Sequence, residues 1–301
     1  MADKMLDCVV IGAGPAGLTA AIYLARFRRD FRVIESGSSR AGWIPRSHNL
    51  PGYPDGVRGT TLLSRMRRQA EKYGARIGSG RVERLTPVTG GFEVATETET
   101  LQARAVILAT GVIDNAPDIP GLEDGVARGL VRICPICDGY EVIGQKVGVI
   151  GRDDHCAREA LFIRATYSDD VTFIHVGHDP PDPALRRELK KAGVEVIDSA
   201  VQGVVVEKRK ITAFDFGAGE PRKFDVVYSA LGVTPRVQLA VQAGAKLDDS
   251  GRLVVNDHQE TSVPGLYAAG DVVRGLNQIS TAEGEAATAA TDIHNRLREG
   301  R

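Results

Sequence analysis

A glycine-rich turn near the N-terminus constrains the fold more than any other part of the chain. It lies in the stretch DCVVIGAGPAGLTAAIYLARFRRDFRVIES, residues 7–36, where a short apolar run precedes the turn and a helical pattern follows it. Such a run is typical of a buried parallel strand, and a second one, at residues 31–34, follows the helical segment. Strand, turn, helix and strand in this order predict a βαβ unit, and therefore an α/β fold.

The three glycines of the turn have the spacing G-x-G-x-x-G, and each has a physical task. Gly12 permits the tight turn, Gly14 lets the backbone approach a pyrophosphate, and Gly17 lets the helix and the strand pack closely. The helix N-terminus adds free N–H groups and the positive end of its dipole. Glu35 lies about 20 residues beyond Gly14, where a carboxylate accepts hydrogen bonds from ribose hydroxyls. We therefore predict a dinucleotide-binding turn, and a tight turn without a ligand is the alternative.

Charge and cysteine content narrow the class of protein. With 38 Lys and Arg against 39 Asp and Glu, no charge excess favours nucleic acid or an anionic membrane as a partner. No stretch approaches the roughly 18 apolar residues of a membrane span, and the first residues read as a strand entry rather than a signal peptide. We expect a cytoplasmic protein. Cys8 reads as a small core residue, whereas the close pair Cys134 and Cys137 is a redox or metal candidate.

Two later segments indicate which dinucleotide is bound. Residues 103–111, ARAVILATG, form a predicted buried strand with a small-residue turn, and residues 261–272, TSVPGLYAAGDV, form a strand that ends in Gly-Asp. Together with the N-terminal turn they match the three motifs of FAD-binding two-dinucleotide oxidoreductases, and the chain resembles that family. Residues 48–75, HNLPGYPDGVRGTTLLSRMRRQAEKYGA, and 134–139, CPICDG, are similar to the low-molecular-weight thioredoxin reductases. This resemblance runs along essentially the whole chain.

The resemblance implies an FAD cofactor and a homodimer. It puts Asp271 at the ribitol of FAD and Asn49 in the flavin pocket, although Asp271 is also a candidate N-cap of the following helix. Where thioredoxin reductases carry Gly-Gly-Gln, this chain has AGWIPRSHN, which puts Trp43, Arg46 and His48 at the flavin edge; single tryptophans also pack in cores. The residues expected to bind FAD are Gly12, Gly14, Gly17, Glu35, Trp43, Asn49, Thr110, Gly111, Gly270, Asp271 and Gln278.

The order of the segments predicts two Rossmann-like three-layer α/β domains, with the second inserted in the first. Residues 1–115 and 246–301 form the expected FAD-binding domain, with an antiparallel meander at residues 80–104. Residues 116–245 form the expected NAD(P)-binding-like domain, which carries the C-x-x-C pair. A segment rich in Pro, Gly and Asp, residues 112–129, is the predicted linker between them.

The expected chemistry is concentrated in RICPICDGYE. Two thiols separated by two residues in a first helical turn form a reversible disulfide, and the nearby N–H dipoles favour the thiolate. In thioredoxin reductases the second cysteine faces the flavin, the first attacks the partner and the next Asp is the acid, which implies these roles for Cys137, Cys134 and Asp138. Structural zinc is the alternative. It needs four ligands, and only His155 and Cys156 are near candidates.

A second turn and helix, VIGRDDHCAREAL at residues 149–161, departs from the dinucleotide pattern. A nicotinamide loop of this family carries glycine and a small residue where this chain has Asp153 and Cys156. Relatives continue the next strand with His-Arg-Arg, which binds the 2′-phosphate, whereas Val176 and Gly177 follow the histidine here. A carboxylate about 4 Å from a phosphate costs roughly 4 kcal/mol. Each missing arginine contact costs about 1.5–3 kcal/mol, against about 8 kcal/mol for micromolar binding.

These observations predict an FAD-dependent thiol/disulfide oxidoreductase. It passes electrons between FAD, the Cys134–Cys137 disulfide and a thioredoxin-like protein or small dithiol, without NADPH. The degenerate site then holds a second flavin or nothing, as in ferredoxin-linked, diflavin-linked or dithiol-oxidase relatives, and no metal is expected. Two alternatives stay open: a conventional NADPH-dependent thioredoxin reductase, and a non-catalytic flavin-binding redox sensor.

Overall fold

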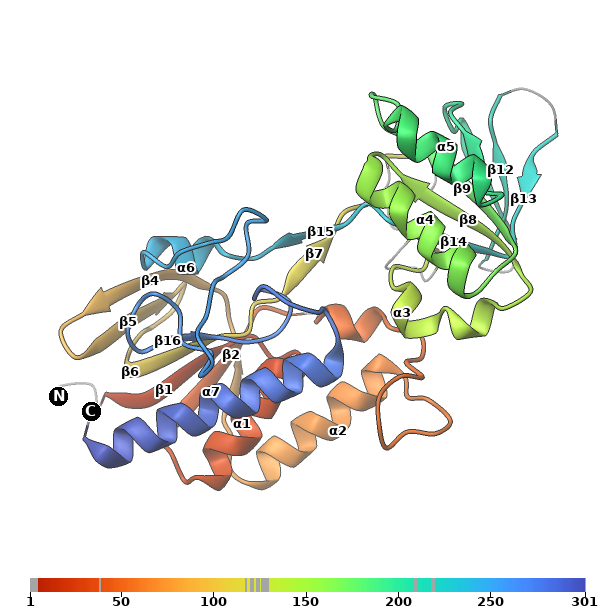
Figure 1. Cartoon of the computed structure of the whole chain (residues 1–301). Helices are drawn as coiled ribbons and strands as arrows, with labels where there is room; N and C mark the ends of the chain where they lie inside the picture. Colours follow the sequence, from red (N-terminus) through yellow and green to blue (C-terminus); the bar gives the residue numbers. More distant parts are fainter. Residues whose placement is uncertain are drawn as a thin grey trace.

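The computed structural model describes residues 5–37, 39–116, 118, 119, 122, 125, 130–207, 210–217 and 220–300. Its helices and strands form two α/β units joined by a two-stranded ribbon (Figure 1). In the ribbon, β7 (Val112–Asp114) pairs antiparallel with β15 (Val233–Pro235). The predicted linker at residues 112–129 thus begins with β7, and most of its remainder from residue 117 on lies outside the described residues.

The first unit contains a seven-stranded sheet. Its strands are β1 (Leu6–Ile11), β2 (Phe31–Glu35), β3 (Ile77–Ser79), β4 (Val82–Val88), β5 (Gly91–Thr96), β6 (Thr100–Leu108) and β16 (Leu266–Ala268). The strands β3, β2, β1, β6 and β16 run parallel, whereas β4, β5 and β6 form an antiparallel meander, as predicted. β16 and β5 pair with different halves of β6.

Three helices cover one face of this sheet: α1 (Pro15–Arg26), α2 (Gly59–Lys72) and α7 (Ile279–Glu299) (Figure 1). The apolar run of β1 is explained by burial on both faces. Cys8 and Val10 pack with the helices, whereas Val9 and Ile11 pack with the meander on the other face. Small residues in α1 and α7, such as Ala20 of α1, let these helices pack closely.

The second unit is also three-layered. Its parallel sheet has the order β10 (Glu195–Ile197), β9 (Asp170–His175), β8 (Lys146–Gly151), β14 (Val226–Ser229). Two helices, α4 (Asp154–Thr166) and α5 (Pro183–Lys191), pack on one face, and an antiparallel sheet packs on the other. That sheet consists of β11 (Gly203–Glu207), β12 (Lys210–Asp215) and β13 (Arg222–Lys223). The mixed, Rossmann-like α/β fold predicted from the sequence is confirmed.

Each unit also carries short helical elements. The first unit carries the 3₁₀ turn η1 (Arg40–Trp43) and α6 (Gln238–Gln242), whose Ala240 packs in the same core as Val9. The second unit carries α3 (Pro135–Asp138) and the 3₁₀ turn η2 (Tyr140–Val142). The domain limits at residues 115/116 and 245/246 stay a prediction, but α6, which lies inside the predicted second domain, packs in the core of the first unit. No helix in the part of the chain that the structure describes is long and apolar enough to cross a membrane.

Candidate active site

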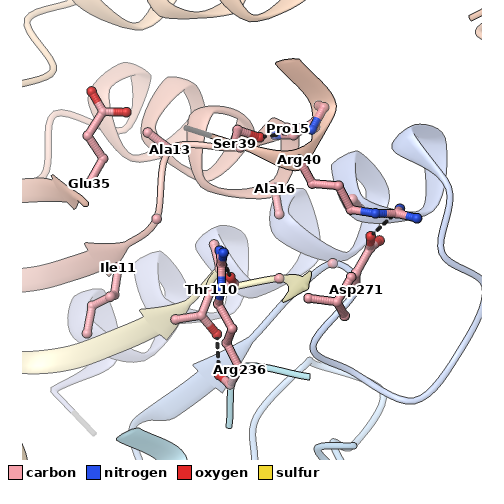
Figure 2. Close-up of a pocket in the computed structure, with 18 of the residues that line it drawn as sticks. Ile11, Ala13, Pro15, Ala16, Glu35, Ser39, Arg40, Thr110, Arg236 and Asp271 are labelled. Atoms are coloured by element: carbon pink, nitrogen blue, oxygen red, sulfur yellow. Dashed lines mark hydrogen bonds and ion pairs between the residues drawn. The ribbon is translucent and has the colours of Figure 1, made fainter. Parts of the chain in front are cut away.

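A cavity of about 680 Å³ opens at the carboxyl ends of the parallel strands of the first sheet. The loops that follow β1, β2, β6 and β16 line it (Figure 2). Cys137, from the second unit, lines it too, so the cavity reaches the helix that carries the C-x-x-C pair. The predicted cofactor-binding residues among its lining are Gly12, Gly14, Glu35, Asn49, Thr110, Gly111, Gly270, Asp271 and Gln278.

Two glycines of the β1–α1 turn sit where no side chain fits. Gly12 has a φ of +110°, and a Cβ there would lie 2.2 Å from the carbonyl oxygen of Ala109. A Cβ on Gly17 would lie 1.9 Å from the carbonyl oxygen of Gly12. Gly14 is the N-cap of α1 and puts no side-chain acceptor on the first turn. The turn therefore presents backbone N–H groups to the cavity, a cradle that fits the pyrophosphate of a dinucleotide.

The predicted ribose acid is paired in this structure. The carboxylate of Glu35 forms an ion pair with Arg67 of α2. Both residues also line a neighbouring cavity of about 340 Å³, and Trp43 lines that smaller cavity. Of the three residues expected at the flavin edge, neither Trp43 nor Arg46 nor His48 is among the described lining residues of the larger cavity. The role of Trp43 at the flavin stays a prediction.

Arg40 lines the larger cavity and pairs with Asp271, which lines it too (Figure 2). Its guanidinium lies 2.7 Å from both carboxylate oxygens of Asp114 in the ribbon, and 3.2 Å from Asp271 Oδ2. Burial acts to lower the pKa of Arg40, but Asp114 and Asp271 raise it overall. Burial raises the pKa of Asp271, against Arg40 and Arg252. The next long helix has Gln278 as its N-cap, so Asp271 does not cap it.

A disulfide joins Cys134 and Cys137 at α3. Nε2 of Gln278, at the start of α7, lies 3.5 Å from Cys134 Sγ and 3.6 Å from Cys137 Sγ. Asn49 donates from Nδ2 to Gln278 Oε1 at 2.8 Å and to the carbonyl oxygen of Ile136 at 3.3 Å. Two predicted cofactor residues thus lie directly against the disulfide helix. They attach that helix to the first unit.

Asp138 follows Cys137 and is held from two sides. Its Oδ1 accepts a hydrogen bond from the hydroxyl of Tyr228 at 2.7 Å, and Oδ2 lies 3.3 Å from Nη1 of Arg132. Burial raises the pKa of Asp138, while Tyr228 and Arg132 oppose that rise and Glu141 adds to it. The carboxyl next to the disulfide therefore lies in an environment that shifts its titration upward.

The β8–α4 loop, the counterpart of the β1–α1 turn, ends in a side-chain cap. Oδ1 of Asp153, the N-cap of α4, accepts a hydrogen bond from the amide of Cys156 at 3.0 Å. Burial acts to raise the pKa of Asp153, but hydrogen bonds to Cys156 and the charge of His155 lower it overall. Cys156 fills the space under the loop: its Sγ lies 3.0 Å from the carbonyl oxygen of Ala230, and burial raises its pKa to about 11.

The end of β9 meets this loop directly. A Cβ on Gly177 would lie 2.1 Å from the carbonyl oxygen of Arg152, so the chain after β9 packs against the loop backbone. Arg186 of α5 lies 2.7 Å from both carboxylate oxygens of Asp198, and His175 Nδ1 lies 3.4 Å from Asp198 Oδ1. Arg186 and Asp198, which lie near this strand end, are therefore already paired.

No group of three or more His, Cys, Asp or Glu residues among those the structure describes is arranged to hold a metal ion. Cys134 and Cys137 are joined to each other, and the buried Cys156 contacts a carbonyl oxygen. The ligand set that the zinc alternative requires is therefore not assembled in the described part of the chain.

Sequence reasoning missed three residues that organise the site: Arg40, Arg132 and Tyr228. Tyr228 lies 90 positions from Asp138 in the chain, so no local spacing relates them. A weak signal was present for Arg132, because an arginine that interrupts the apolar segment LVRIC needs a partner. For Arg40, the partners come from the ribbon and from the loop after β16, which only the fold brings together.

Comparison with known proteins gives a consistent result. The family model described as pyridine nucleotide-disulphide oxidoreductase matches residues 6–286. The thioredoxin reductase of Listeria monocytogenes is 30% identical over 308 residues, which cover 99% of this chain and 95% of that protein. The crystal structure of HlmI superposes with a TM-score of 0.89 at 31% identity, covering 98% of this chain and 93% of that chain. The crystal structure of the thioredoxin reductase from Streptococcus pyogenes superposes with a TM-score of 0.89 at 29% identity, covering 99% of this chain and 100% of that chain.

Proposed function

The chain belongs to the pyridine nucleotide-disulphide oxidoreductase family, and we propose that it exchanges electrons between FAD, the Cys134–Cys137 disulfide and an external dithiol or disulfide without using a nicotinamide nucleotide. It is an FAD-dependent disulfide oxidoreductase of the thioredoxin reductase-like type. The finer claim, that NADPH is not the electron donor, is the proposal. The observation that supports this proposal is the β8–α4 loop, in which the Asp153 side chain caps the helix.

The residues around the larger cavity fit FAD. The glycine turn offers a pyrophosphate cradle, and Glu35 stands where the adenosine ribose is expected. Asp271 lies apart from Glu35 among the lining residues (Figure 2) and is proposed to hold the ribitol, which then shares the carboxylate with Arg40. When bound, FAD supplies the two-electron redox chemistry that the protein side chains lack.

The proposed cysteine roles follow from which of the two cysteines lines the cavity. Cys137 lines it, so we assign Cys137 to exchange with the flavin and Cys134 to attack the external partner. Asp138, with its raised pKa, supplies or accepts the proton that thiol and disulfide exchange requires. Asn49 and Gln278 hold the disulfide helix against the first unit during the exchange with the flavin.

Three features of the second unit oppose a nicotinamide donor. Asp153 supplies the helix N-terminus with its own acceptor and puts a negative charge where a pyrophosphate would lie. Cys156 occupies the space beneath the loop, with its Sγ against Ala230. Arg186, the cation close to the end of β9, is paired with Asp198. The degenerate site is proposed to hold a second flavin or no ligand.

The remaining parts of the proposal rest on the family. Relatives named thioredoxin reductase support a thioredoxin-like protein or a small dithiol as the partner. A homodimer and a cytoplasmic location are proposed on the same resemblance. The conventional NADPH-dependent reductase is the main competing function, and a redox sensor without turnover is the other.

Anaerobic titration of the FAD-loaded protein tests the proposal. We expect dithiothreitol to reduce the flavin, seen as loss of its visible absorbance, and NADPH or NADH at micromolar concentration to leave it oxidised. Reduction by NADPH would replace the proposal with the conventional reductase. Failure of every dithiol and disulfide to react would support the sensor instead.

Two single variants test the cysteine roles in the same assay. Cys137→Ser is expected to abolish flavin reduction by dithiothreitol, because the sulfur at the cavity is lost. Cys134→Ser leaves the Cys137 thiolate facing the flavin, so a long-wavelength absorbance band is expected. Equal and full activity in both variants would contradict the assignment.

A further inference from the structure

We propose that Arg132 and Tyr228 are positioning residues that fix the carboxylate of Asp138. The inference rests on the proposed function, in which Asp138 moves the proton of disulfide exchange. It concerns two residues that make no contact with the flavin cavity in the described structure.

Each carboxylate oxygen of Asp138 has its own partner. The Tyr228 hydroxyl donates to Oδ1 at 2.7 Å, and Arg132 Nη1 lies 3.3 Å from Oδ2. The same Nη1 donates to the backbone carbonyl oxygen of Asp138 at 3.1 Å. Because one donor holds each oxygen and the guanidinium also holds the backbone, the carboxylate has one preferred orientation at the end of the disulfide helix.

Both donors are fixed by the same strand. The backbone N–H of Arg132 donates to the carbonyl oxygen of Val227 at 2.8 Å, and the N–H of Ser229 donates to the carbonyl oxygen of Arg132 at 2.8 Å. Arg132 thus forms a parallel β-bridge with Tyr228 of β14, and the side chain of Tyr228 is fully buried. A strand of the parallel sheet therefore determines where Asp138 points, and the disulfide helix is anchored to the core of its own unit.

The titratable and charged groups that act on Asp138 come from three parts of the chain. Arg132 faces it from the segment before α3, Tyr228 from β14 and Glu141 from η2. Burial and Glu141 favour the protonated acid, whereas the two donors favour the carboxylate. A guanidinium has no acceptor atom, so Arg132 stabilises only the ionised form of Asp138 and not its protonated form. The pH at which Asp138 exchanges its proton is therefore set by the balance between burial and these two donors.

The chain offers a matched control for Tyr228. Tyr267 is also a buried tyrosine whose hydroxyl donates to a carboxylate, Asp292 Oδ2 at 2.6 Å, but it lies in β16 of the first unit. In both tyrosines, burial beside the carboxylate raises the pKa of the hydroxyl. Tyr267→Phe and Tyr228→Phe therefore remove the same chemical group from equally buried sites, and only one of these sites touches the redox helix.

The test is the pH dependence of the rate of flavin reduction by dithiothreitol, measured anaerobically on the FAD-loaded protein. The pH profile of each variant is compared with that of wild type. In that profile, Tyr228→Phe is expected to move the midpoint of the transition that reports Asp138 upward by about one pH unit, equivalent to about 1.4 kcal/mol. The direction is upward because the lost hydrogen bond favours the carboxylate. Arg132→Met is expected to move it in the same direction, Arg132→Lys to restore most of the wild-type midpoint, and Tyr267→Phe to leave it unchanged.

The outcomes separate the two levels of the proposal. If wild type reacts and Tyr228→Phe keeps the wild-type midpoint, the positioning role is wrong and the proposed function stands. A midpoint shift of equal size in Tyr267→Phe would also overturn the role. If wild type does not react with dithiothreitol, the proposed function fails and this inference fails with it. Should Tyr228→Phe not fold, the Arg132→Met and Arg132→Lys pair decides alone.

Discussion

The β1–α1 and β8–α4 loops occupy equivalent places in two similar α/β units, yet they treat the helix N-terminus in opposite ways. In the first loop, Gly14 is the N-cap and contributes no side-chain acceptor. In the second, the Asp153 side chain accepts the amide hydrogen of Cys156. A helix N-terminus attracts an anion through its free N–H groups and its dipole. The first loop keeps that capacity for a ligand, whereas in the second the Asp153 carboxylate already accepts one of these N–H groups and adds its own negative charge.

The glycines of the two loops differ in what they approach. A Cβ on Gly12 would meet the backbone oxygen of Ala109, so this glycine brings two main chains together and leaves the cavity open. A Cβ on Gly151 would lie 2.2 Å from the Cβ of Cys156, so this glycine makes room for a side chain of its own helix. The same residue type therefore shapes a cradle in one unit and a filled loop in the other.

The largest effect is expected from Gly12→Ala. The new Cβ overlaps the carbonyl oxygen of Ala109 and strains the positive φ, so we expect loss of bound FAD and a fall of about 2–4 kcal/mol in the free energy of unfolding. Flavin content after gel filtration and denaturant titration measure both. Gly90→Ala is the control, because Gly90 also has a positive φ, of +82°, but nothing lies within 4 Å of its Cβ position. Normal FAD content in Gly12→Ala would break the comparison.

The next effect is a gain of nucleotide affinity in the second unit. Asp153→Gly alone is expected to give little preference for NADPH, because Val176 and Gly177 still stand where relatives carry the arginines that bind the 2′-phosphate. Gly177 is kept, because a Cβ there would lie 2.1 Å from the carbonyl oxygen of Arg152. Adding Cys156→Ala and Val176→Arg is expected to raise NADPH affinity at least about tenfold, the factor that equals about 1.4 kcal/mol, and to raise it more for NADPH than for NADH. Calorimetry on wild type and both variants measures this. Micromolar NADPH binding by wild type would show that the second loop is not closed to nucleotides.

A smaller effect separates the cap from the charge. Asp153→Ala removes the acceptor of the Cys156 amide, and we expect the free energy of unfolding to fall by about 1 kcal/mol. Asp153→Asn keeps a capping oxygen without the charge and is expected to retain most of that stability. Denaturant midpoints at neutral pH measure the three proteins. Equal loss in both variants would mean that charge, rather than capping, holds this end of α4.

The smallest effect is the pH dependence of that cap. The pKa of Asp153 is lowered in the folded protein from its ordinary value of 3.8. Its stabilisation is therefore present above that value and is lost as the pH falls through the lower, folded-state pKa. The stability difference between wild type and Asp153→Ala is expected to stay constant near neutral pH and to shrink in acid. A difference that grows in acid would contradict this sign.

The sequence predicted most of what local spacing determines. Glycine spacing identified the first turn, and the motif Cys-Pro-Ile-Cys identified the disulfide at α3, because both depend on neighbours in the chain. Asp153 was interpreted only as a charge, although an Asp before a helical pattern is also an N-cap signal. The role of Trp43 at the flavin stays a prediction, and Trp43 lines the smaller cavity together with Arg67. Where η1 turns relative to α2 is a matter of tertiary packing that spacing does not encode.

The contacts around Asp138 and Asp271 also depend on tertiary packing, so they could not be predicted from the sequence. Tyr228 reaches Asp138 from a strand near the end of the second unit, and Arg40 reaches Asp271 across 231 positions of the chain. Residue identity alone gives no reason to pair them. The bridge between Arg132 and Tyr228 of β14 brings Tyr228 to the segment of Asp138, and the pairing of β16 with β6 brings Asp271 to the cavity that Arg40 lines.

The burial of the two remaining cysteines makes thiol titration of this protein unusually simple. Cys8 lies in the core against the helices, Cys156 lies under the second loop, and burial raises the pKa of both thiols. Neither is accessible as a thiolate in the folded state. Every thiol that a reagent such as a maleimide labels in the native protein therefore comes from the opened Cys134–Cys137 disulfide. Two labelled sites correspond to two stored electrons, so mass spectrometry of the labelled chain counts the electrons held by the protein moiety separately from those held by the flavin.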